Sequence, residues 1–257
     1  MSEQVKSQFP TEMVDIPSKG KLYPKEHPFS SGKVEMRYMT AKEEDIITSR
    51  TLIQKGIAFD RLLESLIVEK VDLNTLLLGD KNALMIAARV LGYGKDYTIT
   101  MTDNMNEKHE IQVDLSNLKD KPVDFKKFIS NTRQFEVELP LSKRKVIARI
   151  NDGKDENLIE ADLKGLRKLA KTTGVVPEIT TRLIHSIVSI DGNDKKEAIR
   201  SFVNNELLAG DSSYLRDQLY DMSPDLDMTT EWEDSNGEIQ DIDIPINLDF
   251  FFPNARR

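Results

Sequence analysis

The chain has 257 residues, a net charge of −8, and 39% hydrophobic and 31% charged residues, which is an ordinary balance for a globular protein with a hydrophobic core. It contains no cysteine, which excludes a disulfide-stapled fold, zinc–thiolate sites and a cysteine nucleophile. No apolar run approaches the roughly 18 residues that a membrane-spanning helix needs, and the first residues lack the apolar segment of a signal peptide. We therefore expect folding in a reducing cytoplasm and no membrane partner.

The first 32 residues (1–32) are predicted to form an extended arm with little regular structure. Prolines and glycines punctuate the segment and forbid a long helix; they are Pro10, Pro17, Gly20, Pro24, Pro28 and Gly32. Such an arm lies along a surface, which is either that of its own domain or that of a partner. We prefer the partner, but the proline spacing leaves both open.

Residues 33–118 are predicted to form a helical block followed by a β-hairpin. Apolar and charged residues alternate over residues 34–38, which is typical of a half-buried strand. Thr40 and Glu43 have the spacing of a capping box, so we expect one helix that begins there and ends at Gly56.

Two more helices and the hairpin complete this block. Apolar residues recur at helical spacing from Phe59 to Ile67, and a helix from Lys81 to Val90 is expected to have Asp80 as its N-cap. Residues 97–101 and 111–113 alternate in polarity on either side of a polar connection. This pattern predicts an antiparallel hairpin.

Residues 119–152 are predicted to be a connecting β segment, and residues 153–257 a second helical block with a C-terminal hairpin. The connecting segment contains a β pair over residues 135–139 and 146–150. Four helices joined by short loops follow, and Asn236-Gly237 then marks a two-residue hairpin turn.

Three of these four helices have residues that favour a helix start, namely Pro177, Asp194 and Asp211. The helix after Pro177 is expected to run through Val188, because apolar residues from Leu183 onward recur at helical spacing.

The predicted fold class is α+β, with two helical blocks, each followed by a β-hairpin, and a short β pair between them. The hairpins at residues 97–115 and 226–248 share one plan: a strand, a polar tip, and a strand that ends in an acidic and an apolar residue. This likeness indicates a weak internal repeat, although two hairpins can look alike by chance.

No group of residues indicates catalysis, a cofactor or a metal. His27, His109 and His185 are far apart, and no glycine-rich phosphate loop or nucleophile elbow is present. The basic run Lys143-Arg144-Lys145 is best interpreted as a charged turn between strands, so a nucleic-acid partner is not expected from this acidic chain.

Several short motifs together resemble one family, the baseplate hub subunit and hub-assembly proteins of T-even-type contractile-tailed phages. The motif residues are Pro17, Ser18, Gly20 and Tyr23, then Leu76, Gly79, Asp80, Ala87, Arg89, Tyr93 and Gly94, then Asp114 and Leu115, and finally the aromatic end Phe250-Phe251-Phe252-Pro253. Many relatives carry a Cys-Pro-x-Cys knuckle at the first hairpin tip, where this chain has Thr102-Asp103-Asn104-Met105-Asn106. Any zinc site of those relatives cannot form here in the same way.

The resemblance implies a non-enzymatic structural or assembly protein of a baseplate hub, located in the virion tail after assembly in the host cytoplasm. Its partners would be other hub or tail proteins, and the chain could be retained in the virion or released as a chaperone. The alternative is an intracellular phage adaptor or nucleic-acid-associated protein unrelated to the tail. The partner-binding residues that we expect are Pro17, Tyr23, Phe29, Phe250, Phe251 and Phe252.

Two further expectations concern single side chains. Three aromatic residues in a row on a strand cannot all face one side, so one of Phe250, Phe251 and Phe252 should point away from the others. Arg89, on an otherwise apolar helix, is expected to be structural and to bond helix-end carbonyl groups or an acidic group.

Overall fold

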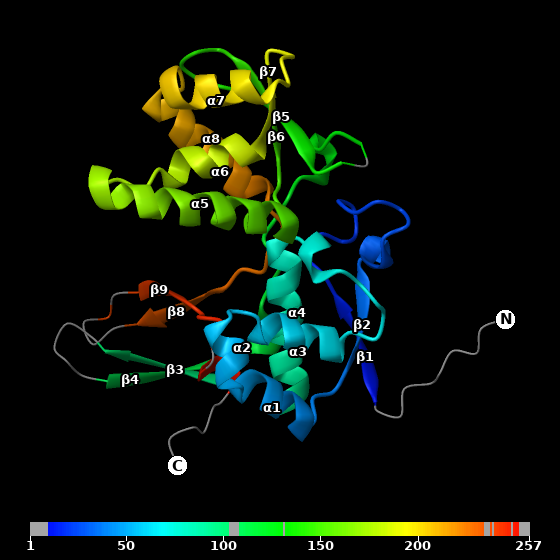
Figure 1. Ribbon diagram of the computed structural model, residues 1–257. Helices are drawn as coiled ribbons and strands as arrows, with labels where there is room; N and C mark the ends of the chain where they lie inside the picture. Colours follow the sequence, from blue (N-terminus) through cyan, green and yellow to red (C-terminus); the bar gives the residue numbers. More distant parts are fainter. Residues whose placement is uncertain are drawn as a thin grey trace.

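The computed structural model describes residues 10–102, 108–130, 132–233, 237, 239–247 and 249–251, and it has an α+β fold (Figure 1). The described residues form eight α-helices and nine strands, and the strands pair in small antiparallel sheets. In Figure 1, helices α5–α8 and strands β5–β7 form the upper part, whereas α1–α4, strands β1 and β2 and two hairpins form the lower part.

The first half of the chain contains β1 (Thr11–Asp15), β2 (Lys33–Arg37), α1 (Ala41–Thr48), α2 (Arg50–Gln54), α3 (Ala58–Leu66), α4 (Leu78–Tyr93), β3 (Asp96–Thr102) and β4 (Lys108–Asp114). The second half contains β5 (Gln134–Glu138), β6 (Lys145–Arg149), α5 (Gly153–Thr173), α6 (Glu178–Ser186), β7 (Ile187–Ile190), α7 (Lys196–Asn205), α8 (Ala209–Met222), β8 (Thr229–Glu233) and β9 (Ile239–Asp243). Short 3₁₀ turns include η1 (Pro28–Ser31), η2 (Leu73–Thr75), η3 (Leu115–Asn117) and η5 (Asp249–Phe251). The predicted hairpin strands and β pair are confirmed, and the predicted turn residue Asn236 lies outside the described residues.

The described part of the N-terminal segment is not the loop-like arm that we expected. Strand β1 pairs with β2 along its length, from Thr11 opposite Arg37 to Asp15 opposite Lys33. The loop between the strands then contributes fully buried side chains, including Ile16 and Phe29, to the core. Pairing between distant segments thus overrides a local sequence that has no strand periodicity.

Two helix predictions also need correction. The single helix expected from Thr40 to Gly56 is broken at Ser49, whose backbone is extended, so α1 and α2 are separate. The helix after Pro177 ends at Ser186, because residues 187–190 form strand β7 and pair with β6. The β-branched residues of β7 favour an extended backbone, and their spacing imitates an apolar helix face.

The two halves of the chain repeat one arrangement of elements in the same order. The N-terminal repeat (residues 11–117) consists of the β1–β2 pair, helices α1–α3, a bridge from Ile67 to Met36 of β2, helix α4 and hairpin β3–β4. The C-terminal repeat (residues 134–251) consists of the β5–β6 pair, helices α5 and α6, strand β7 on β6, helices α7 and α8 and hairpin β8–β9. The β pair that we expected to be an insertion therefore corresponds to β1–β2.

Matching ion pairs support this correspondence. In the N-terminal repeat, Arg37 of β2 contacts Glu43, the third residue of α1, at 2.6 Å between Nη2 and Oε1. In the C-terminal repeat, Arg149 of β6 contacts Asp155, the third residue of α5, at 2.7 Å between Nη2 and Oδ1. Both arginines also donate to a carbonyl group near the end of a nine-residue helix, that of Ser65 in α3 at 2.7 Å and that of His185 in α6 at 3.2 Å.

The C-terminal hairpin packs on the N-terminal repeat. Hairpins β3–β4 and β8–β9 lie side by side in Figure 1, and the rings of His109 and Trp232 are 5.1 Å apart. The η5 turn continues this contact, with Phe250 at 4.9 Å from the ring of Tyr97. The expected division of the chain into four domains stays a prediction.

Candidate interaction site

The motif residues near the N-terminus meet a buried carboxylate of α4. Asp80 accepts a hydrogen bond from the Ser18 backbone N–H at 2.9 Å and another from the Tyr23 hydroxyl at 2.7 Å. The Tyr23 oxygen also accepts from the Leu77 N–H at 3.0 Å. Asp80 is therefore not the N-cap that we expected; Leu77 holds that position, and Asp80 fixes the loop of residues 16–24 to the first turn of α4.

Burial affects the ionisation of Asp80. Asp80 is fully buried, and the loss of solvation raises its pKa although the hydrogen bonds from Ser18 and Tyr23 favour the ionised form. Burial and the neighbouring Asp80 also raise the pKa of Tyr23, so its hydroxyl remains a donor. These hydrogen bonds connect the loop of residues 16–24 to α4, which is a structural role.

A second carboxylate repeats this arrangement in the C-terminal repeat. Asp211 is the third residue of α8, as Asp80 is of α4, and each follows a glycine and an N-cap leucine with φ −67° and ψ 147°. Asp211 is fully buried and accepts from the N–H groups of Leu141 at 2.8 Å and Ser142 at 3.0 Å in the β5–β6 turn. The expected N-cap role of Asp211 is thus also replaced by a contact between distant segments.

Arg89 is structural, as predicted. It is 1% exposed and donates to three carbonyl oxygens: Nε to Phe250 at 2.9 Å, Nη1 to Gly94 at 2.6 Å and Nη2 to Asp96 at 3.1 Å. One guanidinium therefore connects the end of α4, the start of β3 and the η5 turn.

The residues that we expected to bind partners lie in the core of the chain. Pro17, Tyr23, Phe29, Phe250 and Phe251 are all buried. Phe252 lies outside the described residues. The prediction that neighbouring aromatic residues point to opposite faces assumed a strand, whereas Phe250 and Phe251 belong to a 3₁₀ turn and are both 0% exposed. These five residues expose little or no side-chain surface in this conformation, and their role in partner binding stays a prediction.

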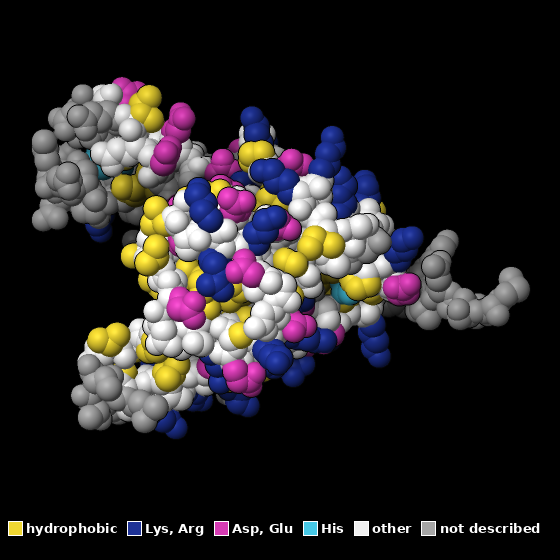
Figure 2. All heavy atoms as spheres, turned by 90° about the horizontal axis from the view of Figure 1, so that it is seen from above, with side chains coloured by type: hydrophobic (Ala, Val, Ile, Leu, Met, Phe, Trp, Pro, Cys, Tyr) yellow, Lys and Arg dark blue, Asp and Glu magenta, His cyan; other side chains and the backbone are white. Residues whose placement is uncertain are grey.

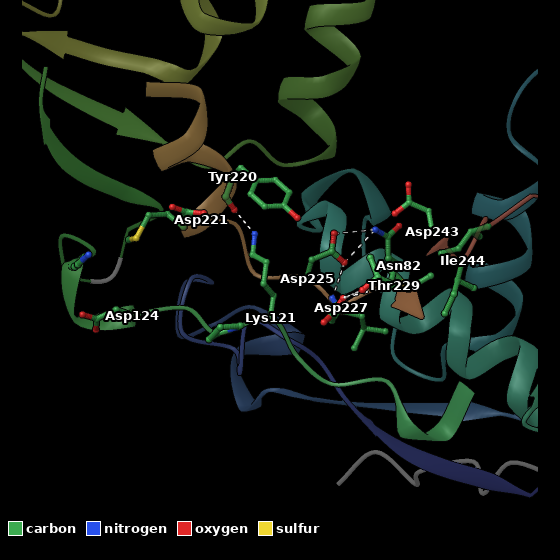
Figure 3. A pocket seen from close by; sticks show the side chains of 16 residues that line it. Asn82, Lys121, Asp124, Tyr220, Asp221, Asp225, Asp227, Thr229, Asp243 and Ile244 are labelled. Carbon is green, nitrogen blue, oxygen red and sulfur yellow. Dashed lines mark hydrogen bonds between the residues drawn. The ribbon is translucent and has the colours of Figure 1, made fainter. Parts of the chain in front are cut away.

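An open groove of about 880 Å³ lies where the two repeats meet (Figure 3). It is lined by residues of α4, of segment 121–127, of the end of α8 and of hairpin β8–β9. In Figure 3 the side chains of Asn82 and Asp225 point toward each other, and Nδ2 of Asn82 is 3.2 Å from Oδ2 of Asp225. This contact joins the two repeats at the floor of the groove, because Asn82 belongs to α4 and Asp225 follows α8.

The groove is rich in carboxylates and is also lined by two lysines, Lys121 and Lys127. Five aspartates line it: Asp124, Asp221, Asp225, Asp227 and Asp243. Burial raises the pKa of Asp225 and lowers that of Lys121. Lys121 Nζ donates to the carbonyl oxygen of Tyr220 and lies 3.8 Å from the centre of its ring, while Tyr220 remains 69% exposed. The sequence pattern had not indicated this groove, since its residues come from four separate segments.

Two residues of the basic turn, residues 143–145, form ion pairs with nearby carboxylates. Arg144 pairs with Asp191 and with Glu206, and Lys145 lies 3.8 Å from Glu136. Figure 2 shows Lys and Arg interspersed with Asp and Glu over the face that it displays, with hydrophobic side chains gathered at its left margin. Acidic partners therefore neutralise much of the turn that could attract a nucleic acid.

The three histidines are well separated in the fold. His27 stacks on Tyr23 with ring centres 4.4 Å apart, and His185 bonds Asp162 at 2.9 Å. Among the described residues, no group of three or more His, Asp or Glu side chains is arranged to hold a metal ion. No helix in the described part of the chain is both long and apolar enough to cross a membrane.

Comparison with known proteins gives one match. The family model described as T4 bacteriophage base plate protein matches residues 10–252, a range that includes both repeats, the Asp80 and Asp211 contacts and the groove. No curated protein and no solved structure matches the chain.

Proposed function

This chain belongs to the family of T4 bacteriophage base plate proteins, and we propose that it is a structural or assembly component of the baseplate hub that acts by binding other tail proteins. The observation that carries the proposal is the family match, which spans nearly the whole chain. Within this proposal the protein is non-enzymatic, assembles in the host cytoplasm and takes its place in the virion tail.

The groove between the repeats is the surface that we propose for a hub partner. Its aspartates favour a segment that brings lysine or arginine side chains, or free N–H donors, to the groove. Asp221 and Asp243 are exposed on its walls, so they can pair with such a segment without disturbing the fold. The partly buried Asn82–Asp225 contact beneath them gives the partner a fixed floor.

The alternative of a nucleic-acid-associated adaptor is less well supported. A phosphate backbone would meet a chain of net charge −8 whose basic turn is already paired with carboxylates. We therefore retain the tail protein as the single proposed function.

Binding to purified hub proteins tests the groove. We expect Asp221→Lys combined with Asp243→Lys to weaken association at least tenfold, because the substitutions reverse two charges on the groove walls. Asp217→Lys is the matched control, since Asp217 is exposed on α8 but does not line the groove. Equal binding by the groove variant and the control would exclude the groove, and the absence of any hub partner would contradict the function.

A further inference from the structure

Two pairs of helices correspond between the repeats. Helices α3 and α6 have nine residues each, and their second residues are Phe59 and Ile179. Helices α4 and α8 share the glycine and aspartate at their second and third positions, which makes Arg89 of α4 the counterpart of Tyr220 of α8. The surface between α3 and α4 therefore corresponds to the surface between α6 and α8.

In the N-terminal repeat this surface is covered by the η5 turn of the same chain. The ring of Phe251 lies 5.8 Å from that of Phe59, and Arg89 Nε bonds the carbonyl oxygen of Phe250 at 2.9 Å. Both phenylalanines are 0% exposed. Two adjacent aromatic side chains on a short turn, preceded by Asp249, thus fill the space between α3 and α4.

In the C-terminal repeat the corresponding surface is open. Ile179, the counterpart of Phe59, is 48% exposed. Tyr220 lines the groove described above and not the hollow between α6 and α8. A hollow of about 380 Å³ lies between α6 and α8, with apolar side chains of Ile179, Leu183 and Leu219 and with Arg182 and Arg216 among its lining. The chain's own aromatic turn cannot occupy this hollow while it is buried on the other repeat.

We propose that the hollow between α6 and α8 is a docking site for a turn that carries two adjacent aromatic side chains after an acidic residue, presented by another protein of the baseplate. The proposal rests on the function proposed above. Arg216 is exposed and has no ion-pair partner among the described residues, so it can pair with the acidic residue of such a turn. The aromatic rings would then contact Ile179 and Leu219, as Phe251 contacts Phe59.

A photo-crosslinking peptide tests the site on the full chain. The probe is a synthetic peptide with the sequence of residues 246–251, in which benzoylphenylalanine replaces the residue at position 251. We expect crosslinks to α6 and α8, and at least a tenfold lower yield with Ile179→Asp. Ile239→Asp is the matched control, because Ile239 is also an exposed isoleucine, at 69%, but lies on β9. The control should retain the full yield.

Three results would overturn the proposal: crosslinks confined to α3 and α4, crosslinks spread over the whole surface, or a yield that Ile179→Asp does not change. Co-purification of the wild-type chain with hub proteins separates this failure from failure of the proposed function. If the peptide does not label the hollow but the chain still binds hub proteins, only the docking site is wrong. If the chain binds no tail protein, the proposed function is wrong as well.

Discussion

The Nε atom of Arg89 donates a hydrogen bond to the backbone carbonyl oxygen of Phe250 at 2.9 Å, across a sequence separation of 161 residues. The bond joins a buried side chain of α4 to the last described turn of the chain. Because the same guanidinium also bonds the carbonyl groups of Gly94 and Asp96, it connects the end of α4 and the start of β3 to the η5 turn.

Replacement of this arginine should destabilise the fold. Arg89→Leu removes the donors for three carbonyl groups in a buried setting, and we expect the free energy of unfolding to fall by about 2–4 kcal/mol. Chemical denaturation measures the loss. Arg200→Leu, on an exposed position of α7, should change stability by no more than about 0.5 kcal/mol. If the two variants are equally stable, Arg89 is not a structural connector.

Gly79 of α4 lies at the contact between the repeats, so a substitution there tests this contact. A Cβ atom at Gly79 would lie 2.0 Å from the carbonyl oxygen of Pro224 and 2.6 Å from Cα of Asp225, so one backbone must move. We expect Gly79→Ala to lower the free energy of unfolding by about 1–3 kcal/mol.

Gly165→Ala in α5 is the matched control for this substitution. A Cβ atom at Gly165 would have no neighbour within 4 Å, and alanine favours a helix more than glycine does, so stability should rise by about 0.5–1 kcal/mol. Thermal melts of both variants measure the expected loss of stability for Gly79→Ala and the expected gain for Gly165→Ala. A neutral Gly79→Ala would mean that the helix and the segment after α8 are not in close contact.

Tyr23 should matter for stability because its hydroxyl is the bond between the N-terminal loop and α4. Tyr23→Phe removes the donor to Asp80 and the acceptor of the Leu77 N–H, and should cost about 1–3 kcal/mol. Tyr214→Phe, at a 38% exposed position, is the control and should be nearly neutral. Urea denaturation curves compare the two. Equal midpoints would show that the Tyr23 hydroxyl does not hold the N-terminal loop on α4.

The Arg37–Glu43 pair predicts a loss of stability in acid. Burial alone would raise the pKa of Glu43, but hydrogen bonds from Arg37, Thr40 and Ser65 outweigh it and lower this pKa to about 2 from an ordinary value of 4.5. Because the folded-state pKa is the lower one, the contribution to stability is present above pH 4.5 and is lost as the pH falls toward 2.

Glu43→Gln should remove this part of the pH dependence. The variant is expected to be less stable than the wild type at pH 7, and the difference should shrink as the pH falls from 4.5 toward 2. Denaturation at a series of pH values measures how the stability difference between the two proteins changes with pH. A constant difference between the two proteins over this range would show that the carboxylate charge at Glu43 does not support the fold.

Local patterns predicted the elements whose signal lies within a few residues. Alternation identified the strands of β3–β4 and β5–β6, and the Thr40–Glu43 spacing identified the start of α1, because these features depend on the period of the side chains. Strand β7 was missed because its apolar residues continue the spacing of α6.

Long-range pairing accounts for the remaining errors. Nothing in the N-terminal sequence indicates that Thr11 lies opposite Arg37, and the apolar residue pattern does not tell which repeat buries Phe250 and Phe251. The repeat itself did leave a signal in the sequence. Lys-Val-x-x-Arg occurs at residues 33–37 and again at residues 145–149, and Leu-Leu-x-Gly-Asp occurs at residues 76–80 and again at residues 207–211.

Quantitative mass spectrometry of baseplate assembly intermediates, isolated from infected cells, tests the central claim most directly. If the chain is a structural or assembly component of the hub, it should be present at a fixed ratio to hub proteins in at least one intermediate, whether or not the finished virion retains it. Its absence from every baseplate intermediate and from the virion, while it is abundant in the lysate, would contradict the account.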